Sequence, residues 1–164
     1  MQLEPSFLTR TLTSGTVSGL AVALAASLAG KREAASYSAP LNATSHILWG
    51  DEAARHSAPS AKYTASGFLL NHAAALMWAG VYEKWVEPAV GRWFARRPEL
   101  APLAPAVSAA AVSAGAYVTD YYLVPRRFTP GYEKRLSGKS MAVIYGALAL
   151  GLAATTLLRQ NRSA

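Results

Sequence analysis

The sequence predicts an all-α protein, an integral membrane four-helix bundle with an interfacial or re-entrant helical segment in its first connector. The first observation is composition, because 52% of the 164 residues are hydrophobic and only 15% are charged, whereas soluble domains carry about 25% charged residues. Second, four segments are free of charge or carry a single acid, and each has the roughly 20 residues that cross a bilayer. Third, Lys and Arg gather at the ends of these segments.

All 164 residues are expected to form a single membrane domain. Its expected spans are residues 11–30, 63–82, 100–124 and 140–158, with the interfacial segment at residues 40–56. The composition excludes a disordered chain, and the absence of cysteine excludes a disulfide framework or a zinc-cysteine site. Although the net charge is +7, nucleic acid is not an expected partner, because no basic patch interleaved with aromatic residues accompanies the charge.

The first span, 11–30, is longer than the roughly 7–15 apolar residues of a signal peptide, so a retained helix is favoured over a cleaved leader. Gly15, Gly19 and Ala23 recur every four residues along it, and Gly151 lies in a similar stripe of the last span. Helices in lipid associate through close backbone approach, which small residues permit. The stripe therefore has two interpretations, packing within the bundle or dimerisation of two chains.

Residues 40–56 are too apolar for a freely solvated loop, and too short and polar to cross the bilayer. An interfacial or partly re-entrant helix is the expected compromise, with Trp49 at the level of the lipid headgroups. The polar side chains of this segment form a candidate interfacial cluster of His46, Asp51, Glu52 and His56. Glu52 and His56 are four residues apart and share a helical face. That spacing is typical of a solvated face as well as of a ligand pair, and it does not complete an HExxH zinc motif.

Aromatic residues and prolines mark the ends of the middle spans. Tyrosines bracket the second span, 63–82. The third span, 100–124, opens with Pro102 and Pro105 and is closed by Pro125. Proline is tolerated in the first turn of a helix, and the residue before a proline disfavours helical backbone. The prolines therefore predict both ends of the third span.

With four spans, the connectors 31–62 and 126–139 lie on the same face of the membrane. The Lys and Arg residues are divided almost evenly between the two faces, so the positive-inside rule leaves the absolute orientation open. Cations at the ends of the spans are expected to meet the anionic headgroups of the lipid bilayer. The pattern is compatible with a homo-oligomer or with a larger membrane complex.

Two ionisable residues lie inside the expected spans, where their cost makes each a candidate for function. At 1.5 Å per residue, His72 lies roughly 13 Å below Tyr63, and Asp120 lies roughly 7 Å from Pro125. Both depths are measured from one face, so the two side chains are expected to meet in the bundle interior. Three interpretations remain open: a structural tie, a proton or ion path, and a metal or haem site. The last needs further ligands.

Further polar groups flank this pair. Asn71 precedes the histidine, and Tyr117 and Tyr121 share a helical face beside Asp120. The tyrosines are either an aromatic belt at the membrane surface or the lining of a site for a polar group or a quinone-like ring. No nucleophile elbow, P-loop or Rossmann motif is present, so no catalytic residue is identified. No cofactor is expected.

The runs LNATSHILWGDEA (residues 41–53) and YVTDYYLVPRR (residues 117–127) resemble small uncharacterised multi-pass inner-membrane proteins of proteobacteria. The resemblance extends from about residue 10 to about residue 158 and implies location and helix number only. We therefore expect an integral protein of a bacterial inner membrane without assigned catalysis, acting as an accessory or assembly subunit of a membrane complex. The alternatives are a small transporter or proton-conducting protein that uses His72 and Asp120, and a haem-, metal- or quinone-binding membrane protein.

Overall fold

The computed structural model describes residues 5–163, and the side chains of residues 5–161. Every regular element in this range is helical, which confirms the all-α class. The long helices are α1 (Phe7–Ala34), α5 (Ser66–Val81), α7 (Ala104–Val118) and α8 (Gly138–Ser163). The shorter helices are α2 (Ala39–Thr44), α3 (His46–Trp49), α4 (Asp51–Arg55) and α6 (Glu87–Phe94). The π-helical turns are η1 (Ala61–Ala65), η2 (Tyr82–Val86) and η4 (Thr119–Leu123), and the 3₁₀ turns are η3 (Ala101–Leu103), η5 (Arg126–Phe128) and η6 (Tyr132–Lys134).

Three helical segments among the described residues are long and apolar enough to cross a membrane: Phe7–Ala34, Ala101–Leu123 and Gly138–Asn161. The first and third of these segments contain the expected spans 11–30 and 140–158, and the second lies within the expected span 100–124. The second expected span lies in a backbone that stays helical from Ala61 to Phe94, yet this segment is not one of the three. Asn71 and His72 interrupt its apolar run. Length and composition thus support three membrane spans among the described residues.

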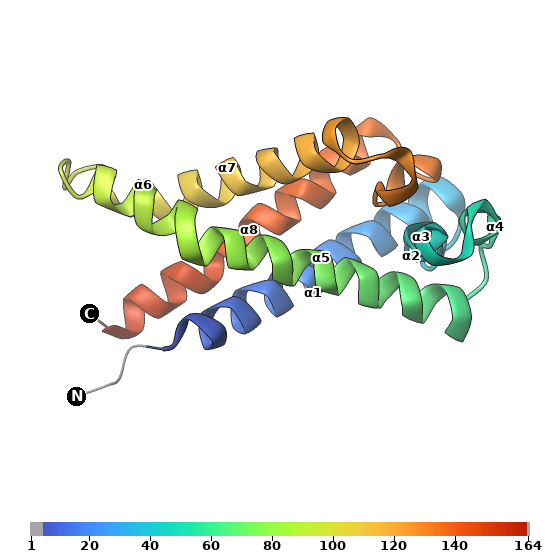
Figure 1. Cartoon of the computed structure of the whole chain (residues 1–164), viewed down its shortest axis with the longest axis horizontal. Helices are drawn as coiled ribbons and strands as arrows, with labels where there is room; N and C mark the ends of the chain where they lie inside the picture. The colour runs from blue at the N-terminus through green and yellow to red at the C-terminus, as the bar shows by residue number, and fades with distance from the viewer. Residues whose placement is uncertain (1–4, 164) are drawn as a thin grey trace.

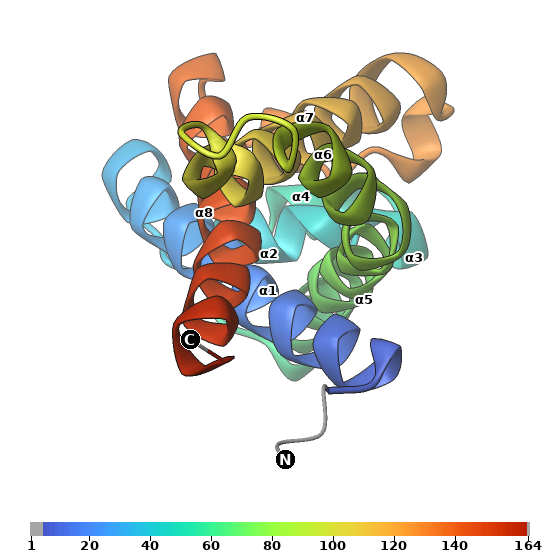
Figure 2. The same ribbon diagram turned by 90° about the vertical axis from the view of Figure 1, so that its left-hand side faces the viewer.

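The four long helices form a bundle with unequal contacts. Helix α1 packs along both α5 and α8, and α7 packs on α8, whereas α5 and α7 barely touch. Seen from the end, α5 and α8 lie on opposite sides of α1, and α7 lies above them (Figure 2). Along the long axis, α6 meets α7 at one end of the molecule, and α5 diverges from α7 toward the other end (Figure 1). The divergence leaves room for the cavity described below.

Local chemistry accounts for the helix ends. The hydroxyl of Ser6 accepts a hydrogen bond from the N–H of Thr9 and caps α1. Helix α8 is preceded by Ser137, whose N–H donates to Oε2 of Glu33 at 2.6 Å. A carboxylate is favourable there because it meets the positive end of the helix dipole. The prolines predicted to frame the third span do so, since α7 follows Pro102 and helical structure stops at Leu123, before Pro125.

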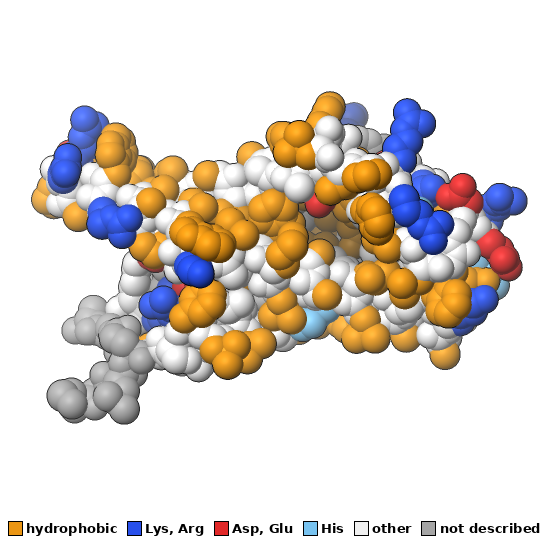
Figure 3. Space-filling view, viewed as in Figure 1, with side chains coloured by type: hydrophobic (Ala, Val, Ile, Leu, Met, Phe, Trp, Pro, Cys, Tyr) orange, Lys and Arg blue, Asp and Glu red, His pale blue; other side chains and the backbone are white. Residues whose placement is uncertain are grey.

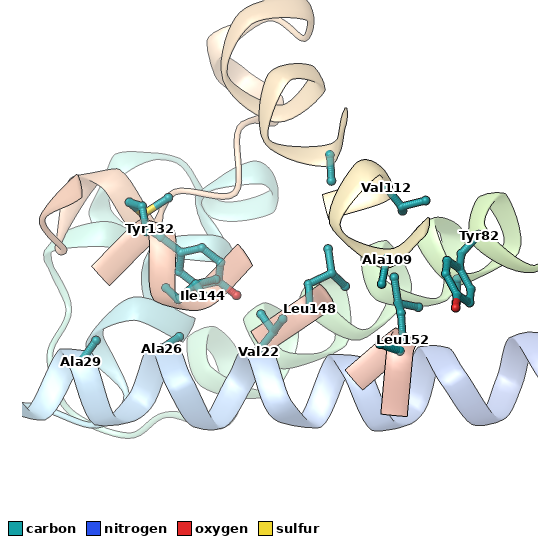
Figure 4. Close-up of a cluster of buried hydrophobic side chains, with 14 of the residues drawn as sticks. Val22, Ala26, Ala29, Tyr82, Ala109, Val112, Tyr132, Ile144, Leu148 and Leu152 are labelled. Carbon is teal, nitrogen blue, oxygen red and sulfur yellow. The ribbon is translucent and has the colours of Figure 1, made fainter. Parts of the chain in front are cut away.

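Small residues allow the helices to approach closely. A Cβ added at Gly15 would lie 2.8 Å from the Cα of Leu76 on α5, and one at Gly151 would lie 2.6 Å from the Cα of Ser18 on α1. Ala23 is buried on the same helix. The glycines of the α1 stripe therefore meet α5 within this chain, as the bundle interpretation expects. The core beside it is formed by Val22, Ala26, Ala109, Val112, Ile144, Leu148 and Leu152 (Figure 4).

The first connector folds into a cap at one end of the bundle (Figure 1). The expectation of one interfacial or re-entrant helix over 40–56 is wrong, because the chain turns at Ser45 and again at Gly50, where φ is +74°. Every residue of α2 is buried. A Cβ at Gly67, at the start of α5, would collide with the carbonyl oxygen of Leu41, so glycine is needed for α2 to lie against α5.

The cap also binds the last connector. Lys134 pairs with Asp51, and Arg135 donates to the carbonyl oxygen of Ala54 at 3.0 Å and to the hydroxyl of Ser57 at 2.7 Å. The connectors 31–62 and 126–139 thus contact each other directly at one end of the bundle. That they share one face of a membrane stays a prediction.

Candidate functional site

The expected pairing of His72 with Asp120 is wrong. His72 faces α1, where its Nε2 lies 3.5 Å from the hydroxyl of Thr16. Its ring stacks on Phe68 with 6.0 Å between centroids. A Cβ at Gly19 would lie 2.9 Å from its Nδ1. The imidazole thus lies in the interface between α1 and α5. The proton path expected through this pair would need a contact between His72 and Asp120, and the two side chains have different partners.

Asp120 has a different partner. It lies in η4, the π-helical turn that follows α7, and its Oδ2 accepts a hydrogen bond from the hydroxyl of Tyr145 on α8 at 2.6 Å. The distance is typical of a charge-assisted hydrogen bond. π-Helical turns occur frequently at functional sites, where they redirect a side chain. Here the carboxylate is aimed toward α8 and the bundle interior.

A cavity of about 50 Å³ lies beside this carboxylate. Its lining comes from α1, α5, η4, η6 and α8 and includes Asn71, Ala74, Trp78, Asp120, Tyr132 and Tyr145. The lining holds one acid and no base. A recess opens on the face of the molecule shown in Figure 3, between α5 and α7, where these helices diverge. The cavity is far smaller than the roughly 300–1,000 Å³ of drug-sized sites, so it does not accommodate a haem or a quinone ring.

Asn71 is fixed on the opposite wall. Its amide nitrogen donates to the carbonyl oxygen of Gly19 at 3.0 Å, and its amide oxygen accepts from the hydroxyl of Tyr132 at 2.8 Å. Tyr132 belongs to the last connector, and burial raises the pKa of its hydroxyl. The phenol therefore stays neutral and remains a donor. The sequence-predicted residues Asn71 and Asp120 thus line one cavity, whereas His72 does not.

The tyrosines divide between lining and support. Tyr117 packs edge-on against Tyr145 with 5.3 Å between centroids, and Tyr121 lies 6.2 Å from the same ring. Neither lines the cavity, so the lining role expected of these two belongs to Tyr132 and Tyr145. Sequence reasoning missed both. The available signal for Tyr145 was its place as the tyrosine inside an otherwise aliphatic and small-residue span.

The candidate interfacial cluster disperses into separate contacts. Asp51 pairs with Lys134. Glu52 accepts from the hydroxyl of Tyr63 at 3.2 Å, and the His56 ring lies 5.0 Å from the same tyrosine. The contacts of Glu52 and His56 hold the cap on η1, the turn that precedes α5.

His46 is separate from the other three and is buried. Its Nδ1 lies 2.9 Å from the carbonyl oxygen of Ala43, which fixes Nδ1–H as the donor. Within the part of the chain that the structure describes, no three His, Cys, Asp or Glu side chains are placed to hold a metal ion.

A buried charge cluster at the opposite end of the bundle was also missed. The carboxylate of Glu83 is fully buried and lies 3.4 Å from Arg10 and 3.3 Å from Arg159. Next to it, the hydroxyls of Tyr82 and Thr156 lie 3.0 Å apart. The sequence did not distinguish these arginines from the other cations at the ends of the spans, which are expected to meet lipid headgroups. In the structure the two arginines join α1, η2 and α8 through a shared acid.

Comparison with family models, with curated proteins and with solved structures finds no match for this chain. Its function is therefore argued from the geometry of the cavity and of the bundle around it.

Proposed function

We propose that this chain is an integral protein of a bacterial inner membrane that crosses the bilayer four times, and that it is a small transporter holding a small solute in the Asp120 cavity.

The distribution of buried and exposed side chains in this bundle differs from that of a soluble bundle. Small and hydroxyl side chains such as Ser14, Ser18, Ala26, Ala109 and Ala116 are buried. Large apolar side chains point outward from all four long helices, among them Leu20, Leu24, Leu69, Met77, Val118, Val143 and Leu150. Lys and Arg gather toward the two ends of the molecule, and the middle is mostly apolar (Figure 3). Soluble monomers rarely expose so much contiguous apolar surface, whereas lipid tails solvate it.

The fourth crossing is supported by the helix from Ala61 to Phe94. The polar groups that interrupt its apolar run, Asn71 and His72, both bond to α1 and not to the surroundings. Its ends carry matching interfacial pairs: the Lys62 ammonium lies 4.7 Å from the Trp49 ring, and Lys84 lies 4.7 Å from Trp85. Lys62 and Lys84 are about 33 Å apart along an α-helix, close to the roughly 30 Å hydrocarbon thickness.

The observation that carries the transport proposal is the carboxylate of Asp120 beside an open cavity. A charged side chain at the centre of a membrane helix costs about 2.5–3.5 kcal/mol on insertion scales, and less toward the interface. A purely structural role does not need such a group, because the single hydrogen bond to Tyr145 is one that a neutral amide also accepts. The recess beside it gives a solute a route to the acid.

The experiment uses the natural absence of cysteine. Ala74, which is exposed and lines the cavity, and Met77, which is three residues along the same helix and exposed outside the cavity, are each replaced by cysteine. In lipid vesicles, N-ethylmaleimide should modify Ala74→Cys at least tenfold faster than Met77→Cys, because a thiolate forms only where water enters. Equal rates, or an unreactive Ala74→Cys, would show that solutes do not reach the cavity and would overturn the proposal.

A specific observation favours a second function, that of an accessory or assembly subunit. A groove of about 420 Å³ between α7 and α8 is lined by small side chains, including Ala110, Ala114 and Ala142. A Cβ at Gly146 in this groove would meet nothing within 4 Å, unlike one at Gly151. The occupant we propose is a transmembrane helix of another membrane protein, because close backbone approach is what drives helix association in lipid.

This second function makes its own prediction. Gly146→Leu should remove a partner that co-purifies with the wild-type chain in mild detergent, while the thermal stability of the isolated chain stays unchanged. Retention of the same partner by the variant would exclude the groove as its binding surface. A dimer of this chain that the substitution dissolves would identify the occupant as a second copy instead.

A further inference from the structure

We propose that the Asp120 cavity binds an organic ammonium group, that is, a primary or methylated amine that is cationic at neutral pH. Asp120 is its counter-ion, and the rings of Trp78, Tyr132 and Tyr145 form its aromatic walls. This inference rests on the proposed function, since it names the chemical class of the solute held in the same cavity.

The charge of the lining points to a cation. Asp120 is the one acid on the cavity wall, and no Lys, Arg or His accompanies it. No ion pair among residues 5–161 includes it. A carboxylate in a low-dielectric site needs a compensating partner, which is either a proton or a cation from outside the chain. A cationic ligand provides both charge and hydrogen-bond donors.

The hydrogen bonds made by the cavity lining also favour a cationic ligand. The hydroxyl of Tyr145 already donates to Asp120, and that of Tyr132 already donates to Asn71. The amide of Asn71 donates to Gly19. The indole N–H of Trp78 is buried without a partner and is closed to solvent. Because the donors are engaged or covered, an anion finds little to accept from, whereas the carboxylate can still accept from an ammonium group.

The aromatic walls add a second attraction. Indole and phenol rings attract a cation placed within about 6 Å of their centroids, and tryptophan attracts it most strongly. Three such rings line the same cavity as the carboxylate. The volume of about 50 Å³ fits a small ammonium group and leaves any longer substituent to extend through the recess between α5 and α7 (Figure 3).

Two sources can supply this group. Asp120 lies roughly 7 Å along the helix axis from Pro125, near the capped end of the bundle. The headgroup of phosphatidylethanolamine can enter sideways from the bilayer at that depth, and a soluble amine can enter from water. The chemistry recognised is the same in both cases, and the experiment distinguishes them.

The test measures protection of Ala74→Cys against N-ethylmaleimide in the full-length protein, purified in a nonionic detergent. The probes are ethanolamine and tetramethylammonium chloride, each compared with a neutral molecule of similar shape, ethylene glycol and tert-butanol. We expect saturable protection by both cations and none by the neutral compounds. Adding Asp120→Asn should weaken protection at least tenfold, whereas Asp51→Asn, the same change at a remote acid, should leave it unchanged. Asp120→Glu, which retains the charge, should keep the preference for cations.

The outcomes separate the two proposals. If Ala74→Cys does not react at all, the cavity is closed to solutes and the proposed function fails. If it reacts but neutral compounds protect as well as cations, or Asp120→Asn changes nothing, the site holds a neutral solute or a proton and the ammonium inference is overturned. Slow modification in nanodiscs of phosphatidylethanolamine, but not in those of phosphatidylglycerol, identifies the lipid headgroup as the source. Protection by free ethanolamine with equal rates in both nanodiscs identifies a soluble amine.

Discussion

Replacing Gly151 by alanine tests whether α1 and α8 are held together by backbone contact. The added Cβ would lie 2.6 Å from the Cα of Ser18 and 2.7 Å from its Oγ. Carbon atoms in ordinary contact are about 3.5–4.0 Å apart. A Cα cannot rotate away as the end of a side chain can, so the two helices have to separate by about 1 Å or bend.

The magnitude follows from comparison with Gly146→Ala on the same helix, where the new Cβ meets nothing within 4 Å. Both substitutions replace a glycine inside a helix by alanine, and this replacement by itself stabilises a helix by about 0.5–1 kcal/mol. Only Gly151→Ala also overpacks an interface, at a cost of about 1–3 kcal/mol. The helix term cancels between the two variants, so Gly151→Ala should be less stable than Gly146→Ala by about 1–3 kcal/mol.

The assay is reversible unfolding in mixed micelles of dodecyl maltoside and sodium dodecyl sulfate, followed by circular dichroism. Wild type should be less stable than Gly146→Ala by about 0.5–1 kcal/mol and at least as stable as Gly151→Ala. Equal stability of the two variants would mean that Gly151 does not meet α1 across a tight interface, and the packing described for the bundle would be refuted.

The remaining predictions concern charged and polar groups. A double-mutant cycle on unfolding free energy should give a coupling of about 0.5–3 kcal/mol between Asp120→Asn and Tyr145→Phe, whereas Asp120→Leu and His72→Leu should be additive within about 0.5 kcal/mol, because only the first pair is in contact. A hydrogen bond from the lysine partner of Asp51, together with the charge of that lysine, lowers the pKa of this carboxyl below its ordinary 3.8. The contact is therefore fully present above that pH and is lost as the pH falls through the lowered pKa, so the melting-temperature advantage of wild type over Asp51→Asn should shrink below about pH 4; an advantage that grows on acidification would contradict this sign. Glu83→Gln should destabilise the chain by less than the roughly 3–5 kcal/mol of a fully buried pair, because its arginine partners are 31% and 20% exposed; unchanged chemical stability would mean that this cluster does not tie the helices together.

Much of the helical layout follows from the sequence because its causes are local. Charge-free runs, the prolines around the third span and the glycine stripe of α1 depend on nearest neighbours and on helix periodicity. The structure agrees with the prolines, with the stripe, and with three of the four charge-free runs as candidate spans. The fold of the first connector does not follow from such local causes. Its apolar residues indicated burial, but burial under an interface and burial against α5 give the same composition, so the division into α2, α3 and α4 could not be inferred.

The candidate site was predicted from depth along the helices, and the partner predicted for Asp120 was wrong. Depth depends only on the rise per residue, whereas facing depends on rotation about the axis, and consecutive residues point about 100° apart. Asn71 and His72 are consecutive, and only the first lines the cavity with Asp120. The sequence did not specify which helices are neighbours. Because α5 packs on α1 and diverges from α7, His72 meets α1, and Asp120 meets Tyr145 of α8.

The sequence by itself determined the helical class, the ends of the third span, and the surfaces at which small residues permit contact, because these depend on composition and short spacing along the chain. The tertiary structure alone decided that Glu83 is shared by two arginines, that Tyr132 reaches Asn71 from a distant connector, and that a carboxylate without a basic partner lines a cavity. Each of these joins residues far apart in the chain, and their distances are set by how four helices pack together in space.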